Sequence, residues 1–167
     1  MIRKSIEFVL VFVCFLLQCT LFKFISLGGI APNLLIILTS AFGFMKGRTE
    51  GMFVGFFSGL MVDVLFGNGI IGLYTLIYTY IGFFNGMFNR MFFPDDVRLP
   101  ILLITFSDLI YCFVVYVLTF LLRSRFDFGY YVLHIIIPEA VYTIFITILF
   151  YRLLLKIETS LERHGFE

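Results

Sequence analysis

The amino-acid sequence predicts an all-α fold, a polytopic membrane protein whose six transmembrane helices form one bundle. Of the 167 residues, 61% are hydrophobic and 14% are charged, and the mean hydropathy is +1.06. A soluble domain has roughly a quarter of its residues charged. Six apolar runs approach the ~20 residues that a helix needs to cross a hydrocarbon core. These runs are too long and too uniformly apolar for barrel strands, so helices must satisfy the backbone within lipid.

The connections between the apolar runs are too short to fold by themselves, so we expect a single integral membrane domain over residues 1–167. The expected spans cover residues 5–25, 33–46, 49–66, 70–89, 99–122 and 132–155.

The first two spans have recognisable beginnings. Arg3 and Lys4 precede the first span as in a signal peptide, but no small-x-small cleavage site follows it. We therefore expect this segment to be a membrane helix. The second span opens at Pro32, which we place in the first helical turn, where a proline loses no amide hydrogen bond.

The third span carries a row of small residues that ends in a charge. Glycine recurs every fourth residue, and an aspartate follows at the same spacing, at Gly47, Gly51, Gly55, Gly59 and Asp63. In lipid, small residues at this spacing let two helix backbones approach closely. Four residues turn a helix by about 400°, so the row winds around the axis and its partner must cross at an angle.

The fourth span repeats this glycine spacing with Gly82 and Gly86. The repeat predicts that spans three and four are closely packed elements of the bundle. The sequence leaves open whether the glycine groove packs only within the chain or also against another protein.

Three acids are expected within the membrane, where insertion of a charge costs on the order of 3 kcal/mol. Asp63 either accepts hydrogen bonds from amides of the glycine-rich turn 67–72, and so caps span four, or takes part in binding a partner or ligand. Asp108 and Glu139 have no basic residue one turn away, so their partners must come from another helix or protein. The three acids together are compatible with a proton path or cation site, and for each one alone we favour a protonated acid that hydrogen-bonds between helices.

Other candidate chemistry is sparse. Cys14, Cys19 and Cys112 all lie in expected spans, where cysteine behaves as a small apolar residue, so neither a disulfide framework nor a metal site is expected. Pro138 falls inside the sixth span and should free a carbonyl and bend the helix. No phosphate loop, catalytic triad or basic cluster is present, so we expect no catalytic residues, no cofactor and no nucleic-acid partner.

The basic residues predict the orientation, because cytoplasmic loops are enriched in lysine and arginine. With both termini in the cytoplasm, nine basic residues lie inside and three outside. The inner set is Arg3, Lys4, Lys46, Arg48, Arg90, Arg98, Arg152, Lys156 and Arg163, and the outer set is Lys23, Arg123 and Arg125.

An ordered set of these features resembles the bacterial rod-shape-determining MreD family. The set comprises Ala31-Pro32-Asn33-Leu34-Leu35, Lys46-Gly47, the glycine row with Asp63, Gly67-Asn68-Gly69 and Gly72. The chain is also similar to that family in length, in its six apolar spans and in its short loops. The family pattern carries over to Pro32, Gly51, Gly55, Gly59, Asp63, Gly67 and Gly72. Asn33 departs from it, since the family often has an acid there, and Asp108, Pro138 and Glu139 receive no family role.

The resemblance implies a non-enzymatic scaffold of the cell-elongation machinery in the bacterial cytoplasmic membrane. It implies MreC as the direct partner, with MreB, RodA and the class B transpeptidase of RodA in the same assembly, and a role in regulating peptidoglycan synthesis. It also implies a fold similar to the six-helix substrate-binding subunits of energy-coupling-factor vitamin transporters.

That fold similarity, together with the three intramembrane acids, motivates an alternative function. The chain would then be a solute-binding membrane subunit of a vitamin or small-molecule transporter, with a cavity that opens to the outer face.

Overall fold

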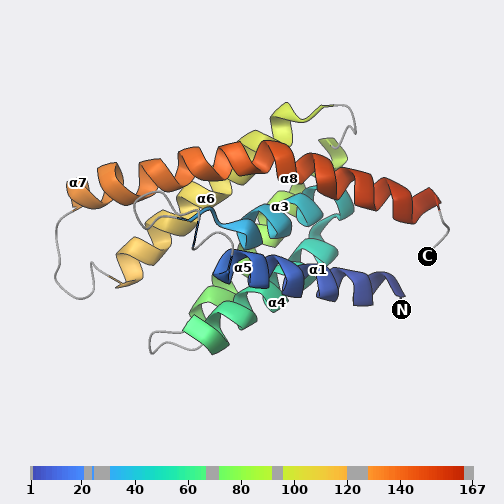
Figure 1. Cartoon of the computed structure of the whole chain (residues 1–167), viewed down its shortest axis with the longest axis horizontal. Helices are drawn as coiled ribbons and strands as arrows, with labels where there is room; N and C mark the ends of the chain where they lie inside the picture. Colours follow the sequence, from blue (N-terminus) through green and yellow to red (C-terminus); the bar gives the residue numbers. More distant parts are fainter. Residues whose placement is uncertain are drawn as a thin grey trace.

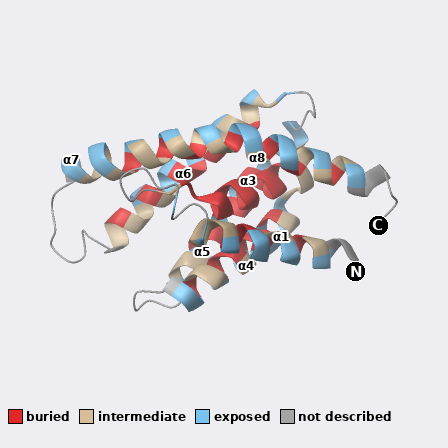
Figure 2. Ribbon diagram, viewed as in Figure 1, coloured by how far each residue is buried: buried red, intermediate tan, exposed pale blue. Residues whose placement is uncertain are grey.

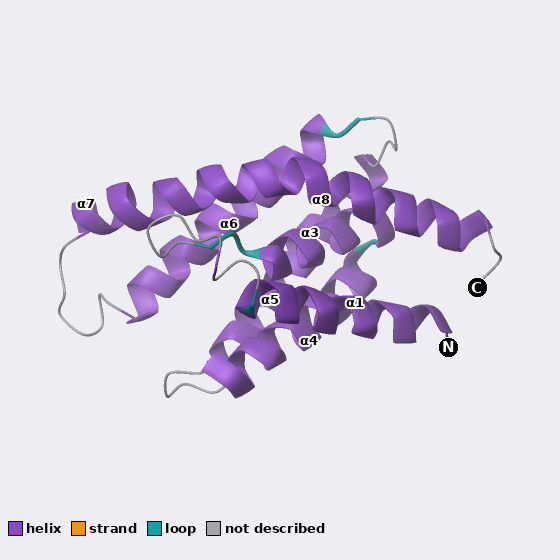
Figure 3. Cartoon of the chain, in the orientation of Figure 1, coloured by secondary structure: helices purple, strands orange, loops and turns teal. Residues whose placement is uncertain are grey.

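The computed structural model describes residues 2–20, 24, 31–66, 72–91, 96–119 and 128–163, and the regular structure within these ranges is helical throughout (Figure 3). The expectation of an all-α fold is therefore confirmed. The helices are α1 (Ile2–Cys19), α3 (Leu34–Lys46), α4 (Arg48–Phe66), α5 (Leu73–Met87), α6 (Arg98–Thr119), α7 (Phe128–Tyr131) and α8 (Ile137–Arg163). A short 3-10 helix follows α5 at Asn89–Met91, and a π-helix, Val132–Ile136, joins α7 to α8.

The centre of the fold is α3, which packs against α1, α4, α5, α6 and α8 (Figure 1). Its side chains are buried from Leu34 to Phe44, and Leu34 to Leu38 are 0% exposed (Figure 2). With 13 residues, α3 is only about 20 Å long, which is shorter than a hydrocarbon core of about 30 Å. Because they are buried, its hydrophobic residues form the interior of the bundle.

The expected six membrane spans are supported only in part by the helices that the structure describes. Two helices are long and apolar enough to cross a membrane by length and composition, over Arg98–Leu118 and Gly129–Ser160. The helices α3 and α5 have only 13 and 15 residues. Six crossings therefore remain a prediction, and so does the orientation.

The expected irregularity at Pro138 takes the form of a widened helical turn. Five π-helical residues, Val132–Ile136, lie directly before α8, and the N–H of Ile137 donates to the carbonyl of Val132. Proline has no N–H to give to the preceding turn, and a π-turn is one way for a helix to accommodate this. The segment leads directly into Glu139 in the first turn of α8.

A buried ion triad joins three helices at one end of the bundle. The Lys46 Nζ atom lies 2.6 Å from Glu7 Oε1 and 3.0 Å from Glu158 Oε2, and the three side chains are 6%, 8% and 11% exposed. Lys46 also lies over the ring of Phe42, 4.5 Å from its centroid. The triad brings the beginning of α1 and the end of α8 together at the end of α3 (Figure 1).

Replacement of the central cation tests the importance of this triad. Lys46→Met should destabilise the protein by about 3–5 kcal/mol, because it leaves two carboxylates buried without a counter-charge. Thermal unfolding in detergent measures the loss, and Arg90→Met, at an exposed position, is the control. Adding Glu7→Gln and Glu158→Gln to Lys46→Met should recover part of the stability. Equal stability of Lys46→Met and Arg90→Met would contradict the role assigned to the triad.

Candidate functional site

The glycine row on α4 is occupied by α5, and these two helices form the most extensive contact in the described chain. A Cβ atom added at Gly51 would lie 2.5 Å from the carbonyl oxygen of Gly82, and one at Gly59 would lie 2.6 Å from that of Tyr74. At Gly55 it would overlap the Tyr78 carbonyl. Glycine is required here because the two backbones are in direct contact.

The contacts are reciprocal and include α3. A Cβ at Gly82 would overlap the Gly51 carbonyl, and one at Gly86 would overlap the backbone of Arg48. Gly43 on α3 meets the same crossing point, since its Cβ would lie 2.6 Å from the Gly82 carbonyl oxygen. Gly43 was not singled out from the sequence, although it precedes Gly47 by four residues and so extends the row.

Gly47 has a different role from the other members of the row. It alone separates α3 from α4, its φ is +102°, and an added Cβ would come no closer than 3.8 Å to another side chain. This left-handed conformation favours glycine. Gly47 is thus a turn residue in the described structure. Gly72, with φ +97°, precedes α5 in the same conformation, and Gly67 lies outside the described residues.

Asp63 caps the beginning of α5. Its carboxylate accepts hydrogen bonds from the N–H of Tyr74 at 3.2 Å, the N–H of Thr75 at 2.8 Å and the Thr75 hydroxyl, and its side chain is only 5% exposed. A carboxylate at this position satisfies free amides and interacts favourably with the helix dipole. The observed donors are residues 74 and 75, beyond the expected turn 67–72, of which residues 67–71 are not described.

The beginning of α3 is organised by Asn33 instead of Pro32. Asn33 is the N-cap residue, so Pro32 lies one position before the cap and not in the first turn. The Asn33 Oδ1 atom accepts hydrogen bonds from the Ile36 N–H and from the Tyr78 hydroxyl of α5. Asn33 therefore connects α3 to α5.

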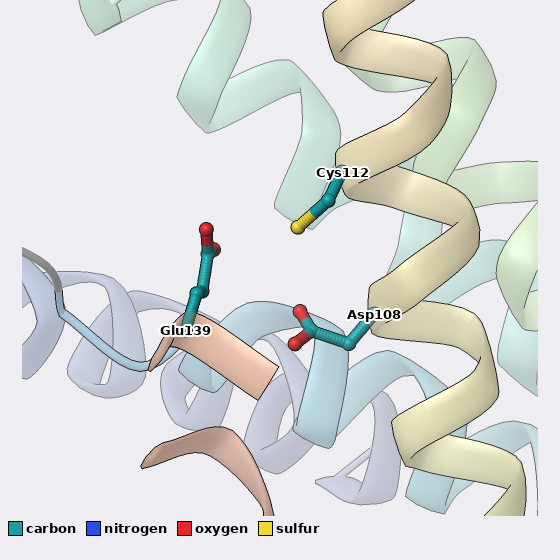
Figure 4. Close-up of side chains that lie close together, drawn as sticks. All are labelled: Asp108, Cys112 and Glu139. Atoms are coloured by element: carbon teal, nitrogen blue, oxygen red, sulfur yellow. The ribbon is translucent and has the colours of Figure 1, made fainter. Parts of the chain in front are cut away.

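Asp108 and Glu139 come together with a third side chain that had been assigned only an apolar role. Asp108 and Cys112 lie one turn apart on α6, and Glu139 reaches them from α8 (Figure 4). One potential ligand atom from each residue lies within 4.8 Å of the others. Asp108 is 0% exposed, and neither of its carboxylate oxygens has a hydrogen-bond partner among the described residues. Asp63 lies in a separate place, at the start of α5.

Alanine at Gly55 tests the α4–α5 contact. Gly55→Ala should destabilise the protein by about 1–3 kcal/mol, the usual cost of overpacking, because the methyl group overlaps the Tyr78 carbonyl. Thermal unfolding in detergent measures the change. Gly129→Ala is the matched control, since nothing lies within 4 Å of its added Cβ. If both variants unfold at the same temperature, the helices do not approach as closely as described.

Hydrogen exchange tests the cap at Asp63. Asp63→Ala should speed exchange of the Tyr74 and Thr75 amides by about twofold to thirtyfold, equivalent to the 0.5–2 kcal/mol of a lost N-cap. The control is Asp96→Ala, which removes an exposed carboxylate that accepts from the Arg98 N–H. Unchanged protection at 74 and 75 in Asp63→Ala would rule out the cap.

Comparison with known proteins identifies the family of the chain. Residues 1–158 match the family described as rod shape-determining protein MreD. No curated protein and no solved structure matches the chain, so the similarity to vitamin-transporter subunits remains an expectation. The match covers nearly the whole length, including the glycine row, the Asp63 cap and the cluster between α6 and α8. The chain therefore belongs to the MreD family of non-enzymatic, integral membrane proteins that determine rod shape.

Proposed function

We propose that this chain is a membrane scaffold of the bacterial cell-elongation machinery that binds MreC and thereby helps regulate peptidoglycan synthesis. Membership of the MreD family gives the role in rod-shape determination. The direct partner, the binding surface and the orientation in the cytoplasmic membrane are parts of the proposal. MreB, RodA and its class B transpeptidase would join the assembly through or beside MreC.

An apolar groove between α5 and α6 carries this proposal. It has a volume of 450 Å³ and is lined almost entirely by apolar side chains. Its rim is open, because Leu76, Tyr80 and Phe84 of α5 are each 57% exposed and Phe106 of α6 is 60% exposed. Within a bilayer such a rim faces lipid, so an apolar helix from another protein is the kind of occupant that it fits.

The groove arises from the way the helices are grouped. On one side, α5 packs tightly against α4 and α3, and on the other side α6 packs against α8 and α3. Direct contact between α5 and α6 is slight. The two groups share α3, which leaves room between α5 and α6 for a further helix.

A polar group in the wall of the groove offers a point of attachment. The Asn85 Nδ2 atom donates to Ser107 Oγ at 2.7 Å and to Ser40 Oγ at 3.3 Å, which connects α5, α6 and α3. The Asn85 Oδ1 atom is buried and has no hydrogen-bond partner within the described ranges. A donor from a partner helix would satisfy this oxygen, as interhelical hydrogen bonds do in membranes.

The proposed orientation has both termini in the cytoplasm. The ion triad supports it, because Glu7 near the N-terminus and Glu158 near the C-terminus meet at the same Lys46. A chain that crosses the membrane an even number of times, six in our proposal, has both termini on the same side. The excess of basic residues at that end selects the cytoplasmic side.

The solute-binding alternative has weaker support. The groove volume lies within the range of small-molecule sites, roughly 300–1,000 Å³. However, its polar side chains are limited to Tyr80, Asn85 and Ser107, which provides few groups to orient a polar vitamin. Native mass spectrometry of the purified protein tests this alternative, because a retained small molecule would favour it.

A bulky residue placed in the groove tests whether MreC binds there or elsewhere on the outer surface of the helices. Ile110→Trp should reduce the amount of MreC that co-purifies in mild detergent by about tenfold, equivalent to 1.4 kcal/mol of binding free energy, because the indole fills the groove. Leu149→Trp is the control, since Leu149 is also an exposed aliphatic residue, at 66% against 41% for Ile110, but lies on α8 outside the groove.

The outcomes distinguish the surface from the partner. If MreC is lost with Ile110→Trp but not with Leu149→Trp, the result supports both the groove as the binding surface and MreC as the partner. Equal recovery of MreC with both variants would reject the groove as the binding surface, and absence of MreC from the wild-type preparation would reject MreC as a direct partner. Matching effects on rod shape in cells that carry each variant provide the functional readout.

A further inference from the structure

We propose that Asp108, Cys112 and Glu139 form a zinc-binding site between α6 and α8. This assignment is independent of MreC binding. The proposed groove lies between α5 and α6, whereas these three residues lie on the other side of α6, towards α8. It follows from the types of side chain that the fold brings together, from the burial of Asp108 and Cys112, and from the absence of a hydrogen-bond partner for the Asp108 carboxylate among the described residues.

Two helices present the three ligands to one point. Asp108 and Cys112 are four residues apart and so share one face of α6. Glu139 is in the first turn of α8, directly after the π-helix Val132–Ile136. Widened turns of this kind are frequent at functional sites. Figure 4 shows the Asp108 carboxylate and the Cys112 thiol directed towards the space beside Glu139.

The Asp108 side chain points independently to a missing ligand. It is 0% exposed, and both of its oxygens lack a hydrogen-bond partner within the described chain. The hydroxyl of Thr143, one turn after Glu139, lies near enough to influence Asp108, but it is itself without a hydrogen-bond partner among the described residues. A buried carboxylate without a partner costs several kcal/mol. A bound cation would offset that cost.

The donor set favours zinc among the common divalent cations. Zinc accepts thiolate sulfur together with carboxylate oxygen, whereas magnesium and calcium require oxygen ligands alone. With Zn–S near 2.3 Å and Zn–O near 2.0 Å, tetrahedral ligand atoms lie about 3.5 Å apart. The ligand atoms lie within 4.8 Å of one another, so they need to approach by at most about 1.3 Å to reach the zinc-bound spacing.

Binding has a balanced chemistry. The Cys112 thiol and any protonated carboxyl group release their protons as zinc takes their lone pairs, and the oxidation state of the metal does not change. Three protein ligands leave the fourth position for a water molecule. The ion would connect α6 and α8, which are, in the described part of the chain, the helices long and apolar enough to cross a membrane.

Metal analysis of the full chain in mild detergent tests the site. The protein is purified with a histidine-free tag, supplied with zinc and dialysed, and its metal content is measured by mass spectrometry. We expect an equimolar amount of zinc in the wild type. Cys112→Ser should weaken zinc binding by at least about tenfold, the loss that even an outer-shell change causes. Cys14→Ser is the matched control, since Cys14 is also buried, at 1% exposed, but lies on α1.

Two further measurements exclude misfolding as the explanation of a loss. Cobalt substituted for zinc should give the thiolate-to-metal absorption band in the wild type and in Cys14→Ser, but not in Cys112→Ser. Helix content by circular dichroism should be the same in all three, and Asp108→Asn should lose zinc while it keeps the cysteine. A wild type that retains no zinc, or a folded Cys112→Ser that retains as much as the wild type, overturns the proposal in favour of a neutral, protonated cluster.

Discussion

The direct contact of backbones at the crossing of α3, α4 and α5 is the constraint on which the rest of the structure depends. Gly43, Gly51 and Gly82 meet there without side chains between them. In lipid no hydrophobic force draws helices together, so association relies on close van der Waals contact. This contact fixes the positions of α4 and α5 around α3, and it leaves α6 and α8 to pack on the other side of the same helix.

Polar contacts hold the helix ends that the glycine contacts do not position. Asp63 holds the beginning of α5, Asn33 connects α3 to Tyr78, and Lys46 draws α1 and α8 to the end of α3. Each of these groups is buried and paired with another element. Asp108 differs from them because both of its carboxylate oxygens are buried without a hydrogen-bond partner among the described residues, which is why it stands out as a place for chemistry.

Composition and spacing were sufficient for the helical class and the close packing of α4 on α5, because these depend on local pattern. The family was named from the resemblance of an ordered set of motifs, and the match over residues 1–158 confirms it. The membrane spans were harder to predict, because a hydrophobic run such as 33–46 has the same sequence pattern whether lipid or protein surrounds it. Cys112 could have been found from its spacing of four residues after Asp108. The approach of Glu139 could not, because it depends on how α8 packs against α6. Glu7 and Glu158 were missed for the same reason, as their common partner Lys46 is distant in sequence.

Helix α3 differs from α6 and α8 in how much of its surface is available to the bilayer. Its apolar residues contact other helices, whereas α6 and α8 expose large side chains such as Leu102 and Phe145, each 68% exposed. With 27 residues, α8 is about 40 Å long, longer than the hydrocarbon thickness of about 30 Å. Hydrophobic mismatch is relieved by tilt, so a change in membrane thickness acts first on α8, whereas α3, which is enclosed by α1, α4, α5, α6 and α8, is shielded from it.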